Sequence, residues 1–143
     1  MRSAAGDAVA GIGGLLAFGA LTSSVVSDNR LSASSPRGTA RVMGAGVMVA
    51  EHPLTVRSTT VSGNTGIANG RHGFARGGGI YDGPFLDIPG GPLVLVNSTL
   101  NGNALTGSAG ITLQGGGLYI ANQPLTSTNS VIADNSPDQC FGC

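Results

Sequence analysis

The sequence predicts an all-β fold in which short strands stack around one axis as a parallel β-solenoid. Three observations predict it: two phrases recur in a fixed order, apolar residues alternate with polar ones inside the repeats, and no segment combines helical periodicity with capping residues. The chain has 143 residues, the size of one domain, and 25 of them are glycine. Hydrophobic residues make up 41% of the chain, so the glycine content does not indicate disorder.

The first recurring phrase is a group of glycines followed by aliphatic residues. It occurs as GIGGLLA, GAGVMV, GGGIY and GGGLYI, beginning at residues 11, 44, 77 and 115. A Cβ at such a point would crowd the repeat above or below, which explains the glycine. We therefore expect Gly46, Gly79 and Gly117 to be structural glycines at which each repeat turns into its next strand.

The second recurring phrase ends in asparagine. It occurs as SSVVSDN, STTVSGN, NSTLNGN and NSVIADN, which end at Asn29, Asn64, Asn103 and Asn135. Equivalent positions in a solenoid lie about 4.8 Å apart, so the four side-chain amides could form a ladder. Alternatively, each asparagine is a turn residue that tolerates a left-handed backbone. The sequence leaves both interpretations open.

The spacing of the asparagines defines the domain organisation. They are 35, 39 and 32 residues apart, so four units of roughly 35 residues cover a single domain, 1–143, with about four coils. Residues 41–75, 76–114 and 115–143 are the better-defined repeats, whereas 1–40 is either a degenerate first coil or a signal-like segment. The uncharged stretch from residue 9 to residue 27 is compatible with a signal sequence, but its overlap with both phrases favours a coil. We expect the chain to be a fragment of a longer solenoid.

Four segments carry a resemblance to a known family. GGGIY at 77–81, GGGLY at 115–119, VNSTLNGN at 96–103 and TNSVIADN at 128–135 resemble repeats of right-handed parallel β-helix proteins in the pectin-lyase-like group. That group includes bacterial polymorphic outer-membrane and autotransporter-passenger-like surface proteins. The resemblance extends over about 41–140, and it departs from the family where Val, Leu or Ile replaces the phenylalanine of FxxN. It implies a right-handed single-stranded β-helix with three sheets and an extracellular or cell-surface location.

Charge and composition narrow the function. The net charge is zero and 10% of residues are charged, so nucleic acid is not an expected partner. The favoured function is a non-enzymatic structural or adhesive protein that contacts a surface glycan or protein, with possible end-to-end self-association. Arg71 and Arg76 form a small positive patch with His72 that could contact an anionic sugar, although a solvated turn explains it equally well. His72 and His52 are isolated, and no metal or cofactor is expected.

Two alternative functions remain open. Polysaccharide lyases and glycoside hydrolases on this fold need grouped carboxylates, and only Asp82 and Asp87, which flank an insertion, are weak catalytic candidates. Solvated loop carboxylates are the more common case, so catalysis is not expected. A module that binds a repetitive surface such as ice would need a flat row of threonines. Thr55 and Thr126 fit such a row, but residues 20 and 94 interrupt it.

The two cysteines form the sequence CFGC at Cys140 and Cys143. A zinc site would need a second pair, and a redox motif would normally open a helix near a βαβ unit. A short disulfide is the favoured interpretation. Free or intermolecular thiols remain an alternative, because the close spacing constrains the geometry of a disulfide.

Overall fold

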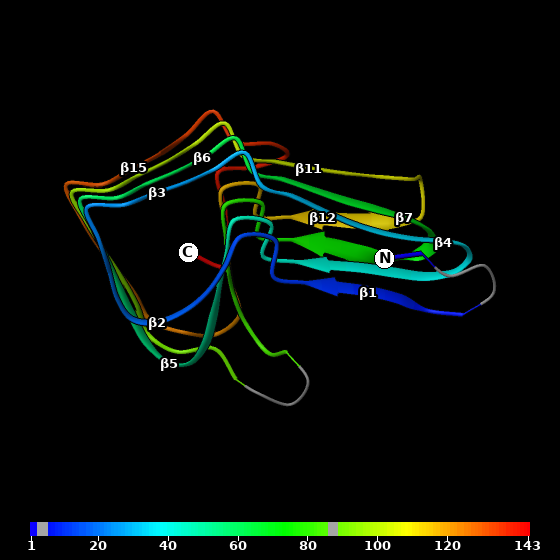
Figure 1. The fold of residues 1–143 in the computed structure, drawn as a ribbon, viewed down its shortest axis with the longest axis horizontal. Coiled ribbons are helices and arrows are strands. Elements are labelled where there is room, and N and C mark those ends of the chain that lie inside the picture. The colour runs from blue at the N-terminus through cyan, green and yellow to red at the C-terminus, as the bar shows by residue number, and fades with distance from the viewer. Residues whose placement is uncertain (3–5, 86–88) are drawn as a thin grey trace.

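The computed structural model describes residues 1–2, 6–85 and 89–143, and every regular element in them is a β-strand (Figure 1). All pairings between the strands are parallel. The prediction of an all-β parallel solenoid is therefore confirmed. The stack makes about three turns rather than the four coils predicted. Four layers of strands lie on one another, and three turns of the chain connect them.

The strands form three sheets, which we call A, B and C. Sheet A contains β1 (Ala8–Gly11), β4 (Arg30–Met43), β7 (Thr65–Arg76), β11 (Ala104–Gly107) and β12 (Ile111–Gln114). Sheet B contains β2 (Leu15–Thr22), β5 (Val47–Arg57), β8 (Ile80–Asp82), β9 (Leu93–Val96), β13 (Leu118–Ile120), β14 (Leu125–Thr128) and β16 (Cys140–Phe141). Sheet C contains β3 (Val25–Ser27), β6 (Thr60–Ser62), β10 (Thr99–Asn101) and β15 (Val131–Ala133).

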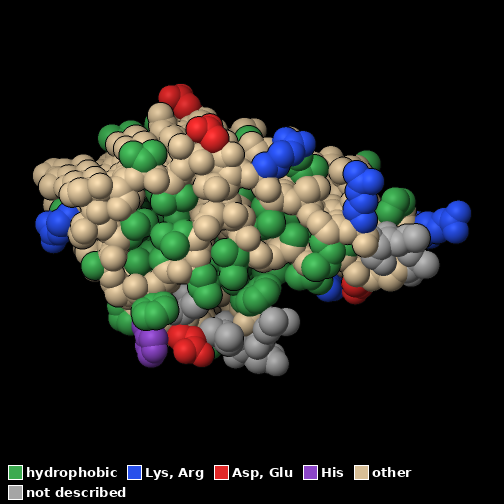
Figure 2. All heavy atoms as spheres, viewed as in Figure 1, with side chains coloured by type: hydrophobic (Ala, Val, Ile, Leu, Met, Phe, Trp, Pro, Cys, Tyr) green, Lys and Arg blue, Asp and Glu red, His purple; other side chains and the backbone are tan. Residues whose placement is uncertain are grey.

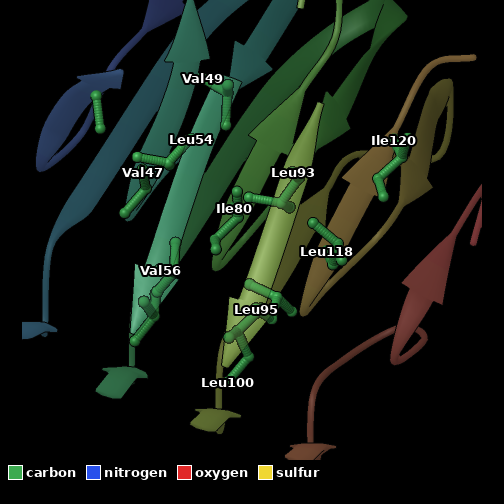
Figure 3. Close-up of a cluster of buried hydrophobic side chains, with 12 residues drawn as sticks. Val47, Val49, Leu54, Val56, Ile80, Leu93, Leu95, Leu100, Leu118 and Ile120 are labelled. Atoms are coloured by element: carbon green, nitrogen blue, oxygen red, sulfur yellow. The ribbon is translucent and has the colours of Figure 1, made fainter. Parts of the chain in front are cut away.

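The main core lies between sheets B and C and is built from aliphatic residues in register (Figure 3). Ile80 pairs with Val47 on one side and with Leu118 on the other, and Val47 pairs with Leu15. Period-two alternation brings this about, because every second residue of a strand points to the same face. Burying each such side chain contributes about 1.5–3 kcal/mol, so the stack of aliphatic rows holds the turns together.

Sheet A extends to one side of this core as a flat wing (Figure 1). We define the wing as residues 1–2, 6–11, 30–43, 65–76 and 104–114. The strand β7 bends back on itself in the wing. Its first half pairs with β11, and its second half, which runs back toward the core, pairs with β12. The two layers are packed mainly by alanines, together with Val42 and Leu105. Such small side chains let the layers lie close together, so the wing is thin.

Three corners of each turn have left-handed backbone, and equivalent corners fall in register. Their positive-φ residues are Ile12, Gly44, Gly77 and Gly115 at the first corner, Ser23, Ser58, Asn97 and Asn129 at the second, and Asp28, Gly63, Gly102 and Asp134 at the third. Left-handed backbone suits Gly, Asn and Asp. A β-branched residue is strained there, so Ile12 is the residue least suited to the first corner.

Candidate functional site

The four asparagines form a continuous ladder of amides at the corner that follows sheet C. The side-chain Nδ2 of Asn64 donates to Oδ1 of Asn103 at 2.9 Å, and Nδ2 of Asn103 donates to Oδ1 of Asn135 at 2.9 Å. Asn29 joins the ladder by donating to Oδ1 of Asn64 at 2.8 Å. Oδ1 of Asn64, Asn103 and Asn135 each also accepts the backbone N–H of the asparagine one turn earlier. All amides in the ladder therefore point the same way.

The ladder ends at a residue that the sequence argument missed. Oε1 of Gln139 accepts both the backbone N–H and the side-chain Nδ2 of Asn135, each at 3.1 Å. Gln139 thus takes the position that the next asparagine would occupy in a further turn. Gln139 lies four residues after Asn135 and outside the repeat phrase. The sequence therefore indicates its role at the end of the ladder only through its side-chain amide.

The asparagines do not themselves adopt the left-handed conformation that the alternative interpretation required. The positive φ at this corner belongs to the preceding residue in each turn, which is Gly63 before Asn64 and Gly102 before Asn103. The side chain of Asn103 is fully buried, and its Nδ2 also donates to the carbonyl of Val61. The asparagines therefore satisfy buried backbone groups as well as one another.

The structural glycines lie directly against this ladder. A Cβ built on Gly46 would lie 2.5 Å from the carbonyl oxygen of Gly79 and 2.9 Å from Nδ2 of Asn64. A Cβ on Gly117 would lie 2.7 Å from Nδ2 of Asn135, and one on Gly79 would meet Asn103 in the same way. The recurring glycines leave the space in which the amides stack.

We predict that Gly79→Ala destabilises the protein by about 3 kcal/mol or more, because overpacking against backbone cannot relax by a side-chain rotation. Gly102→Asn is the matched control: a Cβ at Gly102 meets nothing closer than 3.9 Å, and its φ of +62° suits asparagine. Urea unfolding followed by circular dichroism should separate the two variants. Equal stability losses would contradict the steric explanation.

A second row, of hydroxyl groups, runs along the other end of sheet C. Oγ1 of Thr59 accepts the N–H of Ser24, Oγ of Ser98 accepts the N–H of Thr59, and Oγ of Ser130 accepts the N–H of Ser98. Each hydroxyl donates to the carbonyl two residues earlier in its own chain. Each member of the row lies five residues before a ladder asparagine, so the repeated phrase contained this signal.

Asp82, one of the two weak catalytic candidates, is enclosed in the core. Its side chain has 0% exposure, and Asp82 pairs with Val49 and Ile120 in adjacent strands. Neither carboxylate oxygen makes a hydrogen bond of ordinary geometry. Burial raises the pKa of this carboxyl from 3.8 to about 6, and the backbone N–H of Gly91 lowers it by a smaller amount. Asp87, the other candidate, lies outside the described residues.

Both histidines are exposed. His52 contacts Glu51 at 4.0 Å and the ring of Phe18 at 6.1 Å between centroids. His72 is exposed in the wing. Within 1–2, 6–85 and 89–143, no group of three or more His, Cys, Asp or Glu side chains could hold a metal ion.

The wing concentrates positive charge, which the zero net charge of the chain conceals. Six of the seven arginines lie on it, and Asp7 is its one carboxylate; the arginines are Arg2, Arg30, Arg37, Arg41, Arg71 and Arg76. The described carboxylates other than Asp7 lie outside the wing. The blue side chains in Figure 2 accordingly gather mostly on the side where Figure 1 shows the wing. Asp7 contacts Arg41 at 3.6 Å.

Arg76 lies in the inner corner between the wing and sheet B. Its guanidinium lies 4.2 Å from the ring centroid of Phe74 and 4.9 Å from that of Tyr119, and its Nε donates to Oε1 of Gln114. Tyr119 itself stacks on Tyr81, with 5.2 Å between ring centroids. Of the three residues in the predicted patch, Arg76 is thus held by aromatic rings, whereas Arg71 and His72 are exposed.

The chain ends in a disulfide between Cys140 and Cys143, whose Cα atoms are 6.0 Å apart. Between them, the ring of Phe141 stacks on Tyr119 at 5.3 Å. The ring stack and the strand pairing hold β16 against β13, and the disulfide closes the tail that follows.

The fold and these rows of side chains define the protein as a β-solenoid repeat protein. Comparison with family models, curated proteins and solved structures found no match. In the described part of the chain, no helix is long and apolar enough to cross a membrane.

Proposed function

We propose that this protein is a non-enzymatic, exported β-solenoid that binds an anionic polysaccharide at a cell surface through the arginines of the wing. The observation that carries the proposal is the separation of charge: six arginines against one carboxylate on the wing, in a chain of zero net charge. Guanidinium groups pair well with carboxylate and sulfate groups of sugars, because they offer several donors in one plane.

Exposure and spacing of the arginines support this proposal. Arg30, Arg37 and Arg71 are exposed, and parallel strands place successive turns about 4.8 Å apart. Arg37 and Arg71 lie near the outer bend of the wing in adjacent turns, whereas Arg30 pairs with Thr65 at the other end of β4. The exposed cations are therefore spread over the wing, which suits a polymer that carries several anionic groups.

The resemblance to right-handed parallel β-helix proteins belongs to the same proposal. It comprises right-handed winding, membership of the pectin-lyase-like group, and a bacterial adhesin-like or other surface role. Crossover connections between parallel strands are right-handed in about 98% of cases, which supports the handedness. The Cys140–Cys143 disulfide supports export, because disulfides persist in oxidising compartments.

The alternatives have less support. A glycosidase or lyase needs accessible carboxylates, and Asp82 is enclosed. An ice-type surface needs an unbroken threonine row, but Thr55 and Thr126 share their row in sheet B with Ala20 and Val94.

We predict that the protein binds polygalacturonate and does not bind neutral dextran. Arg37→Gln and Arg71→Gln should each weaken binding about fivefold, about 1 kcal/mol, and the affinity should fall as salt is raised. Arg57→Gln is the matched control, because Arg57 lies in β5 outside the wing. Isothermal titration calorimetry measures the affinities.

Three outcomes would contradict the proposal: equal effects of Arg57→Gln and Arg71→Gln, tighter binding to duplex DNA than to the polyuronate, or release of unsaturated or reducing ends from the polymer. The last would favour the enzymatic alternative, and the second would favour a nucleic-acid partner.

A further inference from the structure

The first turn leaves one end of the solenoid open. An open hollow of about 430 Å³ lies at this end, lined by residues of β2 and β3 together with Gly14 and Asn29. Val25 in β3 is 70% exposed. Hydrophobic side chains gather in the region between sheets B and C in the space-filling view (Figure 2). This end has the composition of an interface and carries the unpaired edges of three sheets.

The last turn leaves a complementary edge at the opposite end. β15 is the terminal strand of sheet C there, and its Val131 is 53% exposed. In the hydroxyl row, each N–H donates to the hydroxyl of the next turn, but the N–H of Ser130 has no partner among the described residues. At the first turn, Oγ of Ser24 donates to Thr22 and accepts no described donor. The row therefore ends in a free donor at one end and a free acceptor at the other.

We propose that these two ends bind each other, so that a second copy of this chain stacks head to tail on the first. Sheet C would then continue with its existing register: β15 of one copy beside β3 of the next, with Val131 opposite Val25, and the N–H of Ser130 donating to Ser24 of the second copy. The contact is heterologous and does not close, so it extends in one direction.

The direction of the ladders selects this arrangement over a symmetric one. In the amide ladder, donors point from each asparagine toward the next turn, so Asn29 presents its Oδ1 acceptor at the open end. Two open ends placed face to face would bring two such acceptors together without a donor. The head-to-tail contact instead places a donor row against an acceptor row.

The C-terminal tail competes with the second copy. Oε1 of Gln139 accepts the two N–H groups of Asn135 that would otherwise reach Asn29 of the next copy, and β16 pairs with β13 where a further strand of sheet B would lie. Both Gln139 and β16 must leave these positions before the full contact forms, because β16 occupies the place of β2 of the second copy. The tail is thus an intramolecular cap that limits stacking, and removing the Gln139 amide weakens the cap and strengthens association.

The test is disulfide trapping between two variants that each carry one introduced cysteine, Val25→Cys and Val131→Cys. Neighbouring residues in parallel strands lie about 4.8 Å apart, within the Cα–Cα range of a disulfide. Each variant keeps the Cys140–Cys143 pair, and the unsubstituted protein sets the background. We expect the mixture to give a cross-linked dimer under mild oxidation, while each variant alone gives only the background level. Both sites are exposed, so circular dichroism should show intact folds.

Gln139→Ala supplies the second readout. Added to both cysteine variants, Gln139→Ala should raise the yield of mixed dimer several-fold. In the protein without introduced cysteines, it should make the sedimentation coefficient rise with concentration. Val131→Lys should abolish that rise. Dimers from Val25→Cys alone as abundant as those from the mixture would overturn the head-to-tail arrangement in favour of a symmetric one. Mixed dimer at the background level, with or without Gln139, would overturn the proposal altogether.

Discussion

Replacing Asp82 with valine should stabilise the protein by about 3 kcal/mol at pH 8. The carboxyl of Asp82 is fully buried and lacks a hydrogen bond of ordinary geometry, and its pKa is raised from 3.8 to about 6. A shift of this size corresponds to about 3 kcal/mol at a pH above both pKa values. Valine suits the position because Val49 occupies the same row one turn away.

The sign of the pH dependence follows from the direction of the shift. Well below pH 3.8 the carboxyl is protonated in both states and its ionisation has no effect on stability. Between about pH 4 and 6 the unfolded chain loses the proton first, so the parent protein loses stability as the pH rises. Well above pH 6 the loss is complete and stability no longer depends on this group.

Urea unfolding from pH 3 to pH 8 measures the difference between parent and variant, in which the titration of other groups cancels. Asp82→Asn should lose the same pH dependence with a smaller gain in stability, because an unpaired amide stays buried. Asp134→Asn is the control at an exposed left-handed corner and should change little. A less stable Asp82→Val protein at pH 8, or a pH dependence that persists in it, would show that the carboxyl has a partner or access to water.

Repetition explains which parts of this architecture the sequence can predict. Residues that recur at fixed spacing report the stacking directly, so the glycine phrase and the asparagines indicate the solenoid and its amide ladder. The hydroxyl row had the same kind of signal, since Ser24, Thr59, Ser98 and Ser130 each precede an asparagine by five residues. It was missed because Ser and Thr are also common in turns.

Features that occur only once are harder to predict. Asp82 borders an insertion rich in glycine and proline, which suggested a solvated loop; yet Ile80 points into the core, and the period of two puts Asp82 on the same face. In the wing, β4 and β7 fold back into two layers that are packed by alanine. Neither the fold-back nor the alanine packing changes the alternation of apolar residues, so the sequence pattern does not reveal the wing. The clustering of arginines follows from the wing, so it could not be inferred from the net charge of the sequence.

Replacing Asn103 with leucine should destabilise the protein by about 4 kcal/mol. Asn103 is fully buried in the middle of the ladder. Its Oδ1 accepts two N–H groups of Asn64 at 3.1 and 2.9 Å, and its Nδ2 donates to Val61 and to Asn135. Leucine of similar size removes these bonds and leaves buried polar groups unpaired, and each such group costs about 1–3 kcal/mol.

Asn101→Ala is the matched control two residues earlier. Oδ1 of Asn101 is buried without a hydrogen bond, and the equivalent residue in the last turn is Ala133. We expect this variant to be as stable as the parent or slightly more stable. If Asn103→Leu loses less than about 1 kcal/mol in urea unfolding, the ladder contributes little to stability and the aliphatic rows alone hold the turns.

Asn103→Asp separates hydrogen bonding from packing, because the side chain keeps its shape and its acceptor. A carboxylate would still accept from Asn64, but it would face the carbonyl of Val61 and Oδ1 of Asn135 with no proton to donate. Burial then favours the protonated form of the new side chain. We therefore expect this variant to be least stable at neutral pH and to recover part of the loss near pH 4, whereas Asn103→Leu should show no such recovery. The contrast would establish that the row acts through its directed donors.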